Sequence, residues 1–424
     1  MNGKEAGTGN IALKAGVWYV ISSIMVKMVS VITTPIFTRV LTTDEYGTVA
    51  TFSSWYTLLL VVYNLNLYIS IGRAKLDYPD KIDRYIGSMQ LLSLLVSAVL
   101  SAGILVFIVQ IASFFELTVF QTVLMLFYLM SGPTINFYQN GCKYKYKYKQ
   151  NIGIAWYITV STVALSLVLI FVFPGDKATL RIMGIVIPNF MLAFILCFRA
   201  WRNGNLKVNL EFWKYGLMIS LPMILHTISM NLLAQSDRVV ISKYYGATQV
   251  AFYSLTRNYA VLLAVVTEAI NQAWQPWFHD SLKEGKENLI KTNSRQLVIL
   301  ICYIGLASIA ISPEAVLLLG GKQYMEAVDC VPPMVLGVVC QCIYTNYINV
   351  EVHMKKTQYA SIGTMIAAAL NIILNLIFVP LYGYAAAAYT TFASYFVLLV
   401  LHYIVSERLL KVSIYDNRFF FLAM

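Results

Sequence analysis

The sequence predicts an all-α integral membrane protein with about twelve transmembrane helices. Apolar residues make up 59% of the 424-residue chain and charged residues only 12%, far from the balance of a soluble domain. The apolar residues fall in runs that are long enough to cross a bilayer, separated by short polar breaks. Because the hydrocarbon core has no water for a stray backbone amide, each run is expected to be a helix.

Twelve runs define the predicted spans. The first is expected to be a retained span, because it is too long for a signal peptide and lacks a small-residue cleavage site. The approximate limits are residues 15–38, 47–72, 85–111, 117–140, 151–173, 179–198, 214–236, 248–275, 296–318, 327–350, 358–379 and 384–405.

The positions of the basic residues predict the orientation, since short cytoplasmic loops retain Lys and Arg. The N-terminal segment, the even-numbered loops and the C-terminal tail hold 23 of the 31 Lys and Arg residues. The odd-numbered loops, with the span ends beside them, hold six. Both termini are therefore expected on the cytoplasmic side of the cytoplasmic (inner) membrane.

The stretch GCKYKYKYKQN, residues 141–151, alternates four lysines with three tyrosines between two predicted spans. Alternating basic and aromatic residues are also found on nucleic-acid surfaces, but the apolar flanks place these at a membrane edge. We interpret Lys143, Lys145, Lys147 and Lys149 as a topology anchor that faces anionic lipid, with the tyrosines at headgroup depth. No nucleic-acid partner is expected.

A weak internal repeat divides the spans into two six-helix halves. TRVLTTDEYG, residues 38–47, matches DRVVISKYYG, residues 237–246, in four of ten places, and the pattern of spans repeats with nearly the same offset. The predicted organisation is a first half, a cytoplasmic linker, a second half and a cytoplasmic tail. Their limits are residues 1–198, 199–213, 214–405 and 406–424.

No signature of catalysis or metal binding is present. The six cysteines form no CxxC pair, and most of them fall inside apolar runs as small hydrophobic residues. The four histidines are scattered, with no HExxH motif and no clustered acid partner, and GGK at 320–322 lacks the other residues of a phosphate loop. A non-enzymatic protein without cofactor or metal is expected.

Several stretches resemble the polysaccharide transporters of the multidrug/oligosaccharidyl-lipid/polysaccharide exporter superfamily. FTRVLTTDEYGTVATF resembles the family's first-loop pattern, and INQAWQPWF, 270–278, resembles the end of its eighth helix. The stretch YGLMISLPMILHTISMNLLAQSDRVVISKYYGATQVAFYSL resembles its seventh-helix pattern, with Pro222, Asp237, Arg238 and Gly246 at the expected places.

The resemblance implies a flippase that works by alternating access around a central cavity lined by helices 1, 2, 7 and 8. The implied cargo is an undecaprenyl-diphosphate-linked oligosaccharide, an O-antigen (lipopolysaccharide) or capsular repeat unit, moved from the cytoplasmic to the outer leaflet. Polysaccharide polymerase machinery is a further candidate partner. The alternatives of the same fold are a flippase for the peptidoglycan lipid precursor and a multidrug exporter.

A membrane polymerase or acyltransferase is a more distant alternative. A polymerase is expected to carry a large external loop, whereas the longest outer loop here, about 312–326, is short. An acyltransferase needs a buried histidine with a polar partner, for which His226 is the single candidate. Radiolabelled acyl or glycosyl transfer by the purified protein would support such an enzyme.

Charged residues deep in a membrane span are costly and usually functional. Lys27 lies near the middle of the first span, and its spacing predicts one helical face shared with Ser23, Ser30 and Thr34. Arg257 lies in the eighth span, and a guanidinium group binds phosphate oxygens as a planar fork. We expect Lys27 and Arg257 to bind the diphosphate; the alternative for each is a structural ion pair.

Polar groups further along these spans complete the predicted cavity. Glu268 is a candidate for proton coupling. It lies eleven residues after Arg257, so the two side chains are expected on nearly the same face of the eighth span. Asp237 and Arg238, with Arg39 in the other half, are predicted to form a gate or ion-pair network. The remaining predicted lining residues are Thr227, Asn231, Gln235 and Asn271.

A proton or a sodium gradient is the expected energy source. Asn371 and Asn375 form an i, i+4 amide pair where the resembling lipid-precursor flippases place a sodium site that uses carboxylates. Because this chain is expected to offer only amides there, protons are favoured over sodium.

Overall fold

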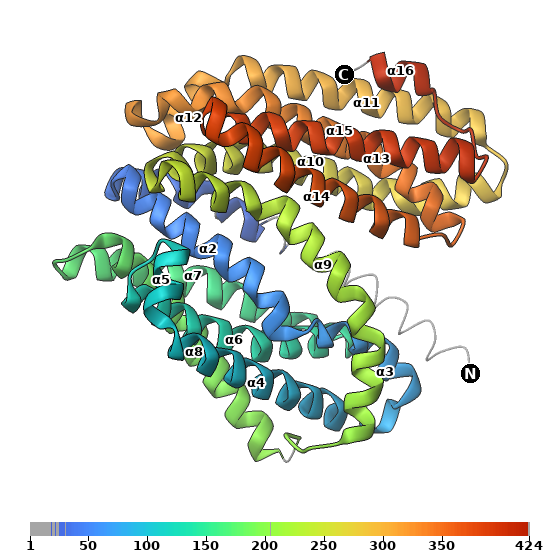
Figure 1. Ribbon diagram of the computed structural model, residues 1–424. Helices are drawn as coiled ribbons and strands as arrows, with labels where there is room; N and C mark the ends of the chain where they lie inside the picture. The colour runs from blue at the N-terminus through green and yellow to red at the C-terminus, as the bar shows by residue number, and fades with distance from the viewer. Residues whose placement is uncertain (1–17, 19–21, 23–24, 30, 204, 423–424) are drawn as a thin grey trace. The chain divides into compact units, whose positions relative to one another are not determined.

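The computed structural model describes residues 18, 22, 25–29, 31–203 and 205–422, and it is built from helices (Figure 1). Among these residues, nine helices are long and apolar enough to cross a membrane, or up to eleven spans if each of two bent pairs is one span. The predicted first span, 15–38, lies partly outside the described residues. The predicted all-α, multi-pass membrane fold is confirmed.

The chain divides into two compact units. Unit 1 comprises Met1–Thr33 and Thr48–Ile228, and unit 2 comprises Thr34–Gly47 and Ser229–Met424. The predicted boundaries of the two halves stay a prediction.

The described residues of unit 1 form two apolar cores. One gathers around Phe52, Tyr63 and Met125, and the other around Tyr85 and Phe137. The helices of unit 1 are α2 (Thr43–Asn64), η1 (Leu67–Ser70), α3 (Ile71–Asp77), η2 (Pro79–Lys81), α4 (Ile82–Val106), α5 (Ile108–Phe115), α6 (Val119–Tyr144), α7 (Tyr148–Val172), α8 (Lys177–Arg202) and α9 (Leu210–Tyr245). The first residues of α2 and the last residues of α9 belong to unit 2.

The second predicted span, 47–72, is broken rather than continuous. Leu65 and Asn66 both have left-handed backbone angles, with φ of 46° and 49°. An α-helix of L-residues cannot continue through such angles, and asparagine adopts them more readily than most residues. The helices on either side are bent by 54°.

The predicted end of the third span, 111, is also wrong. α4 stops at Val106, and the short helix α5 runs from Ile108 to Phe115 before a 92° bend into α6. Thr118 starts α6 with a capping box: its hydroxyl accepts from the backbone N–H of Gln121 at 3.1 Å, and the Gln121 side chain accepts from the N–H of Thr118 at 3.1 Å.

Unit 2 is a helical bundle, and a large apolar core lies among its described residues. α10 and α11 pack on α13, and α15 packs on both α13 and α14. The core includes Leu233, Phe278, Ile343 and Tyr347, all buried. The helices are α10 (Ala247–Lys283), α11 (Glu287–Ala310), α12 (Ser312–Gly320), η3 (Lys322–Cys330), α13 (Val331–His353), α14 (Gln358–Tyr382), α15 (Ala386–Ile404), the π-helix η4 (Val405–Leu409) and α16 (Asn417–Leu422).

Residues 34–47 belong to unit 2 because their polar groups bond to its helix ends. The Thr38 hydroxyl donates to the carbonyl of Leu319 at 2.5 Å, and the Gln323 amide donates to the carbonyl of Thr38 at 3.0 Å. A Cβ atom on Gly47 would lie 1.7 Å from the carbonyl oxygen of Ala247, so only glycine fits there. This close approach gives a physical reason for the glycine that ends the first copy of the repeat.

Candidate functional site

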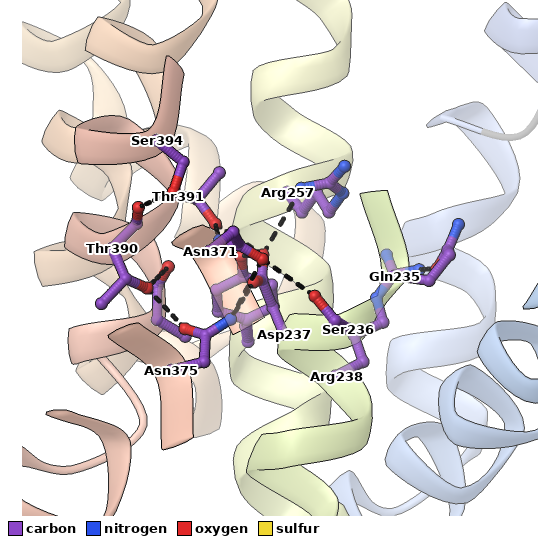
Figure 2. A network of polar contacts seen from close by, with 12 residues as sticks. Gln235, Ser236, Asp237, Arg238, Arg257, Asn371, Asn375, Thr390, Thr391 and Ser394 are labelled. Atoms are coloured by element: carbon purple, nitrogen blue, oxygen red, sulfur yellow. Dashed lines mark hydrogen bonds and ion pairs between the residues drawn. The ribbon is translucent and has the colours of Figure 1, made fainter. Parts of the chain in front are cut away.

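Asp237 is the centre of a polar network buried in unit 2 (Figure 2). Its side chain is only 1% exposed. The residues of the network come from four helices, although they are far apart in the sequence. We define the Asp237 network as Ser236 and Asp237 of α9, Tyr253 and Arg257 of α10, Asn371 and Asn375 of α14, and Thr390 and Thr391 of α15.

Both carboxylate oxygens of Asp237 accept hydrogen bonds. Oδ1 accepts from the Asn375 amide at 2.7 Å, and Oδ2 accepts from the Thr391 hydroxyl at 2.8 Å. Oδ2 also accepts from the hydroxyl of Tyr253. The guanidinium Nη1 of Arg257 lies 3.9 Å from Oδ2, so the buried negative charge has a positive partner in the same unit.

A second set of bonds fixes the partners themselves. Asn371 donates to Thr391 at 3.1 Å, and its carbonyl oxygen accepts from Ser236 at 2.9 Å and from Asn375 at 3.2 Å. The hydroxyl of Thr390 donates to the carbonyl oxygen of Asn375. Because an unmet polar group costs most in a low-dielectric interior, such a connected set holds α9, α10, α14 and α15 in one register.

The network overturns the expectation that only amides are present at Asn371 and Asn375. Asp237 places a carboxylate oxygen 2.7 Å from the Asn375 amide nitrogen. The sequence could not reveal this, because Asp237 and Asn375 are separated by 138 residues. The reason given above for preferring protons over sodium is therefore removed.

The carboxylate beside Arg257 is Asp237 rather than Glu268. Eleven residues of the continuous helix α10 put Glu268 about 16 Å along the axis from Arg257. The Arg257 side chain is 21% exposed, whereas the Asp237 side chain is enclosed, so the arginine is not fully covered by its ion-pair partner. The structural ion pair and the predicted ligand role are thus compatible in one side chain.

The predicted partners of Asp237 are placed differently from expectation. Arg39 donates to the carbonyl oxygen of Leu318 at 3.1 Å, and Arg238 donates to the Gln235 side chain at 2.9 Å. Arg39, Asp237 and Arg238 all belong to unit 2. The gate role of these residues stays a prediction.

The predicted polar lining is spread over both units. Lys27 is half-buried in the helical stretch 25–29 of unit 1, while Ser23 and Ser30 lie outside the described residues. Thr34 is buried, and the Thr227 hydroxyl bonds to its own helix at the carbonyl of Met223, 3.0 Å away. Asn231 is half-buried on α9.

Glu268 lines a separate polar cavity of about 170 Å³ in unit 2. Asn271, another predicted lining residue, is in the same cavity and accepts a hydrogen bond from Asn349 at 3.1 Å. The indole N–H of Trp274 also lines it and is buried without a hydrogen-bond acceptor among the described residues. A carboxylate, amides and an unpaired indole N–H are groups that bind hydroxyl-rich ligands or water.

One buried pair was missed from the sequence. His402 of α15 and Glu351 of α13 are both enclosed, and His402 Nδ1 lies 2.6 Å from Glu351 Oε1. The expectation that His226 is the single candidate for a buried histidine with a polar partner is therefore wrong. The two residues are 51 positions apart, and no local motif marks such a pair.

The chain is similar to two protein families and to two curated proteins. The family model "Polysaccharide biosynthesis protein" matches residues 12–282, and the model "MatE" matches residues 222–377. "Lsg locus putative protein 1" of Haemophilus influenzae is 22% identical over 281 residues, 64% of this chain and 67% of that protein. For an "Uncharacterized membrane protein" of the same organism the match is 22% over 216 residues, and it spans about half of each chain.

Solved structures share the fold at low sequence identity. "Lipid II flippase MurJ, inward closed conformation" has a TM-score of 0.72 and 12% identity, covering 96% of this chain and 90% of that one. A multidrug resistance MATE family transporter of the MOP superfamily, in an inward-facing conformation, has a TM-score of 0.66 and 14% identity, covering 92% and 98%.

Proposed function

Because the chain belongs to the polysaccharide biosynthesis protein family, we propose that it flips polyprenyl-diphosphate-linked oligosaccharides across the membrane. Such a cargo carries a diphosphate that cannot cross hydrocarbon unaided, so a flippase needs fixed cations within its spans and polar groups for the sugars. The proposed cargo is an O-antigen or capsular repeat unit, moved from the cytoplasmic to the outer leaflet of the inner membrane, with both termini of the chain cytoplasmic.

Arg257 is the observation that carries this proposal. Its guanidinium group lies 3.9 Å from the enclosed carboxylate of Asp237 in a membrane span, and the arginine side chain is 21% exposed. The arginine is thus oriented and charged before any ligand arrives, which lowers the entropy cost of binding a phosphate group. We assign Lys27 of unit 1 as the second cation of the diphosphate site.

Flipping by the purified full chain in vesicles tests the proposal. A fluorescent undecaprenyl-diphosphate oligosaccharide is placed in both leaflets, and its exposure to a membrane-impermeant glycosidase is followed over time. In protein-free vesicles only the outer-leaflet fraction of the lipid should be cleaved. With the protein present, we expect the inner-leaflet fraction to be cleaved rapidly as well. The same lipid with a monophosphate linkage is the control, and it should flip more slowly.

The peptidoglycan lipid precursor is the second candidate cargo, because it carries the same diphosphate. In the same vesicles, faster flipping of that precursor than of the oligosaccharide would replace the proposed cargo with it. Transport of hydrophobic cations without flipping of either lipid would contradict a flippase and support an exporter.

Glu268→Gln tests the proposed proton coupling. Glu268 is exposed and lines the 170 Å³ polar cavity, where a protonatable group has access to water. If it carries the coupling proton, the variant should keep its abundance but lose the acceleration of flipping by a pH gradient. Vesicles with a sodium gradient and no pH gradient are the matched condition, and flipping that requires sodium alone would contradict the assignment.

A further inference from the structure

A polar cavity lies at the end of unit 1 where four helices begin or end. α4 begins at Ile82 and α7 at Tyr148, while α6 ends at Tyr144 and α8 at Arg202. The cavity among them has a volume of about 300 Å³, which is the lower end of the range for small-molecule sites. Its charged and amide lining includes Asp83, Gln90, Lys145, Lys147, Arg199 and Asn205.

Close packing gives the cavity a defined shape. On one side, Gln90 donates to the hydroxyl of Thr134 at 3.2 Å, and both side chains are buried. On another, a Cβ atom on Gly87 would lie 2.2 Å from the carbonyl oxygen of Asn205, so the linker after α8 contacts α4 directly. The cavity is therefore part of the packed unit rather than a gap between mobile loops.

The charge balance of the lining is positive. Three basic side chains face one acidic side chain, and the acidic one, Asp83, forms an ion pair with Lys145. Lys147 and Arg199 remain as excess positive charge beside the side-chain amides. A planar guanidinium group and an ammonium group with neighbouring amide donors are the usual partners of phosphate oxygens.

Aromatic residues put this cavity at the level of lipid headgroups. Tyr146 lies between the two lysines and Trp201 lies two residues after Arg199, and both side chains are exposed. Exposed tyrosine and tryptophan beside a membrane span are typical of the interface between hydrocarbon and water. Asp83, Lys145 and Arg199 of the cavity lining come from three even-numbered loops of the predicted topology, which are expected to be cytoplasmic.

We propose that this cavity is a binding site for the phosphate group of an anionic headgroup, separate from the proposed diphosphate site of the cargo. The alternating lysines Lys143, Lys145, Lys147 and Lys149, here called the lysine ladder, then have two functions within one stretch of sequence. Lys145 and Lys147 line the cavity, whereas Lys143 lies over the ring of Tyr144 at 5.8 Å and Lys149 is exposed on α7. Lys143 and Lys149 are thus a matched control for the two lysines that line the cavity.

Binding of phosphatidylglycerol to the purified full chain tests the site. The titration is done in a neutral detergent, with phosphatidylcholine as the neutral lipid. Lys147→Gln/Arg199→Gln should weaken phosphatidylglycerol binding about tenfold or more, as expected for the loss of charge-assisted bonds. Lys143→Gln/Lys149→Gln removes the same charge and should change binding less than about twofold. Thermal unfolding of both double variants verifies that each remains folded.

Inorganic phosphate distinguishes the two sources of the ligand. Saturable phosphate binding that displaces the lipid and is lost in Lys147→Gln/Arg199→Gln would assign the site to free phosphate. Binding of phosphatidylglycerol without competition by phosphate would assign it to a lipid headgroup. Equal weakening in both double variants, or no weakening in either, would overturn the proposal and leave the ladder as a topology anchor alone. Neither result depends on the identity of the flipped cargo.

Discussion

Asp237→Ala is expected to destabilise the protein more than any other single substitution in the network. The change removes the Asp237 acceptor of Tyr253 and Thr391, one of the two acceptors of the Asn375 amide, and the counter-charge of Arg257. Removing one partner of a buried ion pair typically costs about 3–5 kcal/mol. Thermal unfolding of the purified variant should show a large loss of stability, or the variant should fail to accumulate in the membrane.

Arg257→Ala should be less harmful to stability, since the carboxylate retains its three hydrogen-bond donors. A double variant, Arg257→Ala/Asp237→Asn, should regain stability because it removes the unpaired charge but keeps the shape of the side chain. Glu268→Gln in place of Asp237→Asn is the control and should restore nothing. A stable Asp237→Ala protein would show that the network does not hold unit 2 together.

Loss of surface polysaccharide is the second large expected effect. If Lys27 and Arg257 bind the diphosphate, Lys27→Ala and Arg257→Ala should each abolish export while the protein remains in the membrane. Lys27→Arg should be tolerated because a point charge is sufficient, whereas Arg257→Lys loses the planar fork and should be impaired. Export, abundance and thermal stability are measured together for each variant.

The stability-restored double variant separates binding from folding. Arg257→Ala/Asp237→Asn should be stable and still unable to export polysaccharide, because the arginine that is proposed to bind the phosphate is absent. The effects of Lys27→Ala and Arg257→Ala need not add, since both groups act on one ligand. Alanine variants that are stable and fully active would reject the diphosphate site.

The fold was predictable because hydrophobic length is a local property of the sequence. Runs of apolar residues were sufficient to predict the membrane spans and the all-α class, and the seventh-helix pattern around Pro222 and Asp237 predicted the family, which the match over residues 12–282 confirms. The breaks at Leu65 and at Val106 were missed, because both lie inside runs that remain apolar on either side.

The candidate site was only partly predictable, because its contacts connect distant residues. Arg257 was identified as a functional candidate from its depth in a span and Asp237 from its charge at the end of the seventh span, but their pairing was not predicted. Thr391 had no signal of its own and is 154 residues from the carboxylate to which it donates. Such contacts depend on which helices pack against one another, and the hydropathy pattern of the sequence does not show which helices are neighbours.

The bonds of Thr38 also bear on the order in which the protein is made. Its hydroxyl donates to the carbonyl of Leu319, a residue synthesised 281 positions later. At a translation rate of ~5–20 residues per second, that carbonyl emerges roughly 15–55 s after Thr38. Unit 2 therefore cannot be completed until the ribosome has passed α12. In the meantime the Thr38 hydroxyl can donate only to a nearby group, such as the carbonyl of Thr34 in its own helix, or to water or a lipid headgroup. Residues 34–47 are thus the first part of unit 2 to be made and among the last to reach their final contacts.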